Sequence, residues 1–244
     1  IVAKRRSILC FGDSWAYLGA SALKDRVCRE FPNTKVVGYG VSGSTAKQWA
    51  QNKHQLVHYL RTHGGDSSTS HTLTNTDSTN TSDSSDVIVW LSIGGNDISH
   101  YFMQGVQDVD LGMRMIRNDI EVILDALLGQ CNRVKIVHFG YDFMNIQPMF
   151  LGLVGKTITD ANYIVLALNE TIEQLTRLDK YRNRFFYVNI AGELQRAAGV
   201  EGAPRLDMPS PSRFMQDFIH PNGSGFGVLM NKLFEDYLKK ELGQ

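Results

Sequence analysis

The chain has 244 residues, of which 43% are hydrophobic, and its 25 Lys and Arg balance its 25 Asp and Glu to a formal net charge of zero. This balance gives no indication of the strongly basic surface that is typical of a nucleic-acid-binding protein. No apolar run approaches the ~20 residues that a membrane span requires, and the three cysteines form no CxxC pair.

From the N-terminus onward, solid apolar runs alternate with amphipathic stretches. Strands are expected at residues 5–12, 34–40, 86–95, 133–143 and 185–190. Helices are expected at residues 15–32, 44–60, 111–128, 161–178 and 226–243. Strands that are continuously apolar and separated by helices indicate a parallel sheet covered on both faces. The sequence therefore predicts an α/β fold, with one doubly wound, three-layer domain over residues 1–244 and a five-stranded, mostly parallel sheet.

A low-complexity segment at about residues 64–86 interrupts this alternation. It is rich in Ser, Thr, Asn and Asp and contains one apolar residue, Leu73. Such a composition cannot bury enough surface to fold by itself. We expect a mobile, functionally neutral insertion in a surface loop, although a role in recognition is an alternative. It enters the amino end of the third strand, opposite the edge where ligands bind in parallel α/β sheets.

Small polar residues follow the strands at that ligand-binding edge. The first strand ends in "GDS", the second leads into "GVSGSTA" and the third into "GGND", while "DFIHPN" precedes the last helix. Acyl transfer by a serine needs a hydroxyl, a histidine that takes its proton and an acid that orients the histidine. Ser14, His220 and Asp217 supply these groups, and each short motif alone is also an ordinary turn sequence.

In this order, the motifs resemble those of the GDSL esterases, also called SGNH hydrolases, particularly the thioesterase/lysophospholipase and arylesterase branch. The family's four marker positions correspond to Ser14, Gly43, Asn96 and His220. The resemblance implies a flavodoxin-like sheet order, an oxyanion hole made by Ser14, Gly43 and Asn96, and no metal or cofactor. Trp15 departs from the family pattern, which has Leu after the serine. This tryptophan either shapes the acyl pocket or packs in the core.

The predicted function is hydrolysis of carboxylic esters through a Ser14–His220–Asp217 triad and an acyl-enzyme. Short-chain acyl or acetyl esters are the expected small-molecule substrates, with lysophospholipids and thioesters as further options. An acyltransferase that uses the same site and a non-catalytic binding module are the alternatives. The pair His54 and His58 could bind a metal but lacks a clear third ligand. Compartment, secreted or cytoplasmic, and oligomeric state stay open.

Overall fold

A five-stranded parallel sheet forms the centre of the protein in the computed structural model, which describes residues 6–64, 86–103, 108–153 and 155–243. The strand order is β2-β1-β3-β4-β5, and all four pairings are parallel. The strands are β1 (Arg6–Gly12), β2 (Thr34–Gly40), β3 (Val87–Ser92), β4 (Val134–Phe139) and β5 (Phe185–Val188). The α/β prediction and the flavodoxin-like order are confirmed.

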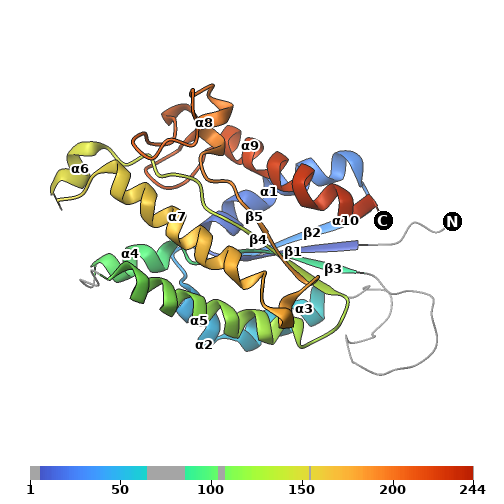
Figure 1. Ribbon diagram of the computed structural model, residues 1–244. Helices are drawn as coiled ribbons and strands as arrows, with labels where there is room; N and C mark the ends of the chain where they lie inside the picture. The colour runs from blue at the N-terminus through green and yellow to red at the C-terminus, as the bar shows by residue number, and fades with distance from the viewer. Residues whose placement is uncertain (1–5, 65–85, 104–107, 154, 244) are drawn as a thin grey trace, which may run out of the picture.

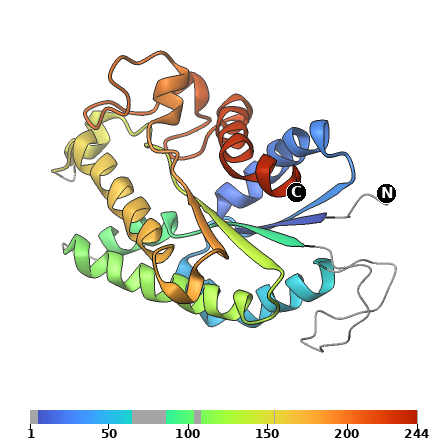
Figure 2. The same ribbon diagram turned by 45° about the vertical axis from the view of Figure 1, so that its right-hand side comes forward.

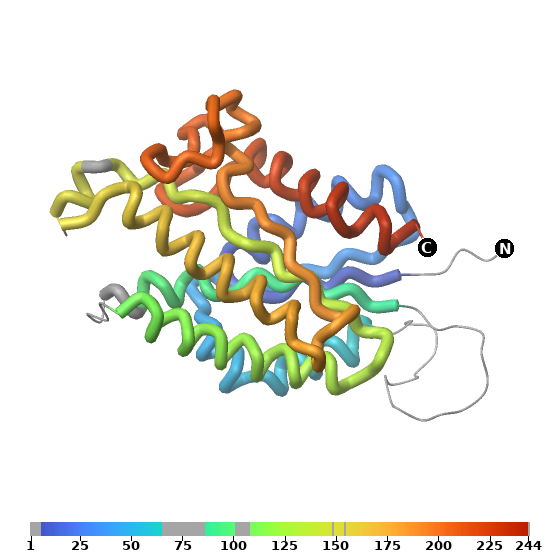
Figure 3. The backbone as a smooth tube through the Cα atoms, viewed as in Figure 1, coloured from blue at the N-terminus to red at the C-terminus, as the bar shows by residue number. Residues whose placement is uncertain are grey.

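Helices cover both faces of this sheet (Figures 1 and 2). The elements on one face are α1 (Ser14–Glu30) and α9 (Gly223–Leu233), which continues through a π-helical turn (Phe234–Leu238) into α10 (Lys239–Gly243). The opposite face carries α2 (Ala46–Gln51), α3 (Lys53–His63), α5 (Val109–Leu128) and α7 (Ile158–Leu175). The backbone trace shows the last helices beside the first one (Figure 3). Helices from both ends of the described chain therefore form the same layer.

Shorter helices lie near the carboxyl ends of the strands. They are α4 (Gly95–Met103), α6 (Pro148–Leu153) and α8 (Glu193–Ala197). Single 3-10 turns occur at Asp179–Tyr181, just before β5, and at Ser212–Phe214. The alternative interpretation of "GGND" as an ordinary turn sequence does not describe Asn96, because Gly95 already begins α4. Asn96 therefore stands in the first turn of a helix that follows β3 directly.

The single helix predicted at residues 44–60 is wrong, because it breaks at Asn52 into α2 and α3. Asn52 ends one helix and precedes the other with φ −106° and ψ 25°, outside the helical region. Its side-chain amide donates to the Gln48 carbonyl at 2.9 Å. This local bond competes with the helical ladder, as asparagine side chains often do.

The central strands β1 and β3 are buried, as their apolar sequences predict. Ile8, Leu9, Val89 and Trp90 on the two central strands are fully buried. Within the described residues, no helix is both long enough and apolar enough to cross a bilayer. The predicted insertion falls almost entirely within residues 65–85, which lie outside the described residues.

Candidate active site

Ser14 is placed by an abrupt turn between β1 and α1. The strand ends at Gly12, whose φ of +141° is a conformation that residues with a side chain rarely adopt. A Cβ at this position would also collide with the Ser92 carbonyl on the neighbouring strand. Asp13 then caps α1 by accepting the Trp15 backbone N–H at 2.9 Å. Ser14 becomes the first residue of the helix, where backbone N–H groups have no acceptor within the helix.

Two hydrogen bonds connect Ser14, His220 and Asp217 in a row. The His220 Nε2 lies 2.8 Å from the Ser14 Oγ, and the His220 Nδ1 lies 2.7 Å from the Asp217 Oδ2. Since ionised Asp217 can only accept, Nδ1 carries the proton and Nε2 is free to accept the serine hydroxyl proton. The structure thus brings together three residues that lie up to 206 positions apart in the sequence.

Asp217 is held in its charged form by its own turn. Its Oδ1 accepts the backbone N–H groups of Ile219 at 2.8 Å and His220 at 2.7 Å. Partial burial raises the pKa of this carboxyl, but these two bonds and the His220 ring outweigh burial and leave the pKa below its ordinary value. Asp217 is therefore an ionised acceptor at neutral pH, although 47% of its side chain is exposed.

Asn96 is joined to the loop that contains Gly43. Its side-chain Nδ2 donates to the Ser44 carbonyl at 3.0 Å, which leaves the second amide hydrogen available to another acceptor. Gly43 has a φ of +77° in this exposed turn, which starts where the Val41 N–H donates to Gly12 O at 2.8 Å. Asn96 lines the cavity beside Ser14, whereas Gly43 lies in the adjoining turn and does not line it.

A cavity of about 40 Å³ adjoins Ser14 and Asn96. Its apolar lining comes from α1, α4, α7 and the segments after β4 and before His220, and consists of Trp15, Ile98, Tyr141, Met144, Val165 and Ile219. Trp15 is only 5% exposed and packs edge-on against Tyr141. Both interpretations of this tryptophan therefore apply, because it is a core residue that also forms a wall of the cavity.

The sequence analysis did not identify Tyr141 or the residues that hold it in place. The Tyr141 hydroxyl donates to the Asp13 Oδ2 at 2.6 Å. The Asn169 side chain, on α7, accepts the Tyr141 backbone N–H at 2.9 Å and donates to the Tyr141 carbonyl at 2.8 Å. The sequence "GYDF" (residues 140–143) was assigned to the fourth strand, but it follows β4 and gave no signal of a site. Asp142 in the same stretch caps the turn before α8 by accepting the Gly192 and Leu194 N–H groups.

Asp13 and Asp97, which flank Ser14 and Asn96, hold backbone in place. Asp97 accepts the Ala46 N–H at 2.8 Å and thereby ties α4 to α2. Burial raises the pKa of Asp13 to about 7, although its bonds from Tyr141 and Trp15 act in the opposite direction. Neither carboxyl bonds to His220 in the described structure, and the bonds that both make hold the loops beside Ser14 and Asn96.

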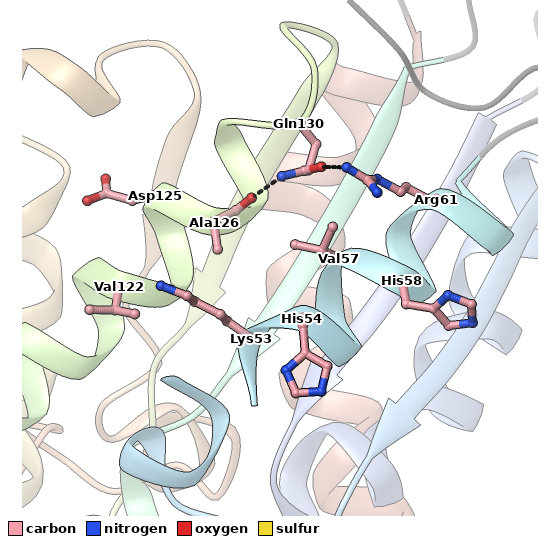
Figure 4. A pocket seen from close by; sticks show the side chains of 9 residues that line it. All are labelled: Lys53, His54, Val57, His58, Arg61, Val122, Asp125, Ala126 and Gln130. Carbon is pink, nitrogen blue, oxygen red and sulfur yellow. Dashed lines mark hydrogen bonds between the residues drawn. The ribbon is translucent and has the colours of Figure 1, made fainter. Parts of the chain in front are cut away.

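A larger, open groove lies elsewhere, between α3 and α5 (Figure 4). It has a volume of about 640 Å³ and contains His54 and His58, the pair considered above for metal binding. Both imidazoles project from α3, while Asp125 projects from α5 away from them (Figure 4). Among the residues that the structure describes, no group of three or more metal-binding side chains occurs. This groove holds neither Ser14 nor His220.

The chain matches a known protein family and is similar in fold to several solved structures. Residues 8–233 match the model of the family described as GDSL-like lipase/acylhydrolase. No curated protein sequence matches the chain. A member of the lipolytic protein G-D-S-L family from Veillonella parvula DSM 2008 is 16% identical, with 96% of this chain and 99% of that chain covered and a TM-score of 0.57.

Two further solved structures have a similar fold. LAE5, an alpha/beta hydrolase from the metagenome of Lake Arreo, Spain, is 15% identical, with a TM-score of 0.60 and coverage of 96% of this chain and 95% of that chain. A carbohydrate esterase family 3 protein from Talaromyces cellulolyticus is 16% identical, with a TM-score of 0.56 and 98% of both chains covered. At these identities, the likeness concerns the fold.

Proposed function

Since the chain belongs to the GDSL-like lipase/acylhydrolase family and is a carboxylic ester hydrolase, we propose that Ser14 is its nucleophile, His220 its general base and Asp217 the residue that orients His220. The observation that carries the proposal is the pair of bonds from Asp217 through His220 to Ser14, at 2.7 and 2.8 Å. Both lie within the range required for proton transfer between positioned groups.

In the first half of the reaction, the Ser14 Oγ attacks the ester carbonyl carbon while its proton passes to the His220 Nε2. The carbonyl oxygen becomes an oxyanion, which accepts hydrogen bonds from the backbone N–H groups of Ser14 and Gly43 and from the Asn96 amide. The positive end of the α1 dipole favours the same charge. Collapse of the intermediate breaks the bond to the alcohol oxygen, and that oxygen takes the proton from His220.

The second half repeats these steps with water. His220 takes a proton from the water as its oxygen attacks the acyl-Ser14 ester, and then returns a proton to the Ser14 Oγ as the carboxylic acid leaves. Asp217 stays ionised throughout and stabilises the imidazolium that forms twice in each cycle. Simple esters with short acyl groups are the proposed substrates, because the cavity beside Ser14 has a volume of only about 40 Å³.

The direct test is covalent labelling with a fluorophosphonate, followed by mass spectrometry of the labelled peptide. Ser14 should carry the label, and Ser14→Ala should lower kcat on p-nitrophenyl acetate by about 10³ or more while the far-UV circular dichroism is unchanged. Ser7→Ala, a buried serine at the other end of β1, is the matched control and should keep its activity and labelling. Labelling of another serine, with Ser14→Ala still active, would refute the mechanism.

A further inference from the structure

The cavity beside Ser14 is small enough to limit the substrate. Its volume of about 40 Å³ is well below the roughly 300–1,000 Å³ of pockets that hold drug-sized ligands. An acetyl group consists of a methyl carbon, a carbonyl carbon and a carbonyl oxygen. A butyryl group adds two methylenes, which would have to enter the same small cavity.

The positions of the proposed catalytic groups indicate which half of the ester enters the cavity. Ser14 and Asn96 line it, but His220 does not. His220 must reach the alcohol oxygen to protonate it, so the alcohol part lies on the His220 side. That side is open, since the Phe218 side chain is 46% exposed and does not line the cavity. The acyl tail, which points away from the leaving group, is the part that faces the cavity.

Packing fixes the inner walls of this cavity. Trp15 is wedged between Tyr141 and Phe226, with ring centroids 5.1 and 5.9 Å away. Tyr141 is anchored at its hydroxyl by Asp13. Val165, on α7, is 2% exposed, and a β-branched side chain on a helix has one strongly preferred rotamer. These groups cannot move aside for a longer acyl chain without disturbing the core.

We propose that the enzyme is selective for acetyl esters and that Val165, together with Met144, sets the limit on acyl length. The inference rests on the proposed function, because it assumes that Ser14 attacks the carbonyl. Val165 is the rigid part of the wall, whereas Met144 is half-buried and has a flexible side chain. Truncation of either residue enlarges the cavity without touching Ser14, His220 or Asp217.

The test is a series of p-nitrophenyl esters from acetate to octanoate, in which the alcohol part stays constant. In the wild type, kcat/KM should fall by about tenfold or more from acetate to butyrate, as expected for methylenes that do not fit an apolar pocket. Val165→Ala should reduce this acetate-to-butyrate ratio at least fivefold, and Met144→Ala should change it in the same direction. Val27→Ala, another fully buried valine on a helix, is the matched control and should keep the wild-type ratio.

Each outcome has a separate meaning. Hydrolysis of none of the esters, by a folded protein that no fluorophosphonate labels, would overturn the proposed function itself. Labelling and hydrolysis with equal rates on acetate and octanoate would leave the mechanism intact and overturn the acetyl limit. An unchanged acetate-to-butyrate ratio of kcat/KM in both folded variants would refute the proposed role of Val165 and Met144. If Val165→Ala does not fold, the wild-type series and Met144→Ala still decide.

Discussion

The Tyr141 hydroxyl donates a 2.6 Å hydrogen bond to the Asp13 Oδ2, one residue before Ser14. The same ring packs against the backbone of Gly95, one residue before Asn96, since a Cβ on this glycine would lie 2.7 Å from the Tyr141 Cε1. Tyr141 thus touches the neighbours of a proposed nucleophile and a proposed oxyanion donor. Neither contact depends on substrate, so Tyr141 is a positioning residue rather than a reacting group.

Tyr141→Phe should therefore lower kcat with little change in KM. The ring would still pack against Gly95, but the buried Asp13 Oδ2 would lose its partner, which typically costs about 1–3 kcal/mol of stability. We expect about a tenfold loss of kcat on p-nitrophenyl acetate, because a small misplacement of reacting groups has large effects on rate. Steady-state kinetics and urea unfolding measure the two effects.

Tyr187→Phe is the matched control for this experiment. The Tyr187 hydroxyl is also buried, but it has no hydrogen-bond partner among the residues that the structure describes. Its removal should leave kcat unchanged and the free energy of unfolding equal or higher. Equal effects of the two substitutions on kcat would contradict a specific positioning role for Tyr141.

A second prediction concerns stability and pH. The pKa of Asp13 rises from 3.8 to about 7 because the side chain is buried. Between these values the folded protein binds a proton that the unfolded chain has released, so this group lowers the free energy of unfolding as pH rises. Asp13→Asn, whose amide can still contact Tyr141 and the Trp15 N–H, removes this titration. Relative to the wild type, the variant should gain on the order of 1–4 kcal/mol between pH 4 and pH 8.

Urea unfolding of both proteins across that pH range checks this prediction. Asp97 and Asp142 also have pKa values raised by burial, to about 6 and about 7, and contribute the same slope. His138, whose pKa burial lowers to about 4, contributes the opposite slope. These groups are present in both proteins, so only the difference between the two curves reports on Asp13. Parallel curves would show that Asp13 is ionised in the folded state.

Asn96 gives a third prediction, for the oxyanion hole. Asn96→Ala removes one donor and should lower kcat by about 10²–10³ while KM changes much less. The substitution also removes the 3.0 Å bond to the Ser44 carbonyl, so thermal unfolding must be measured on the same sample. Asn52→Ala, which removes another asparagine amide bond to a carbonyl, is the control and should retain kcat. An effect of Asn96→Ala on KM alone would assign Asn96 to substrate binding.

The fold could be predicted because short-range apolar patterns encode it. The contact between Ser14 and His220 spans 206 residues and could be predicted because both motifs fall at the carboxyl edge of the sheet, in the order that the GDSL esterases share. The apolar run that ends at Gly12 determines where the serine stands, and the spacing of three between Asp217 and His220 permits their contact within one turn. The break at Asn52 escaped prediction, since the apolar pattern continues across it while a local side-chain bond ends the helix. Local competition of this kind leaves no periodic signal.

The contacts that hold Tyr141 beside the site could not be predicted, for a different reason. Tyr141 meets Asn169 across 28 residues and Asp13 across 128 residues. These pairs exist because β4 lies two strands from β1 and because α7 packs over the sheet, so they depend on tertiary contacts that no motif spacing reveals. The cavity beside Ser14 is likewise formed by α1, α4, α7 and two loops, and its size follows only from their packing.

The last prediction concerns residues 65–85, which should be dispensable for catalysis. The two described residues that flank this stretch belong to an edge remote from Ser14, because Val87 pairs with Ser7, whereas Gly12 pairs with Ser92. Gly64 lies close to Val87, since a Cβ on this glycine would be 3.2 Å from the Val87 Cγ2. A short Gly-Ser link can therefore close the gap. Loop-closure entropy changes little with length, so stability should shift by about 1 kcal/mol at most.

Replacement of the stretch by this link should keep kcat and KM on p-nitrophenyl acetate within about threefold. A hundredfold loss of kcat, with circular dichroism unchanged, would mean that these residues reach the site from the far edge of the sheet.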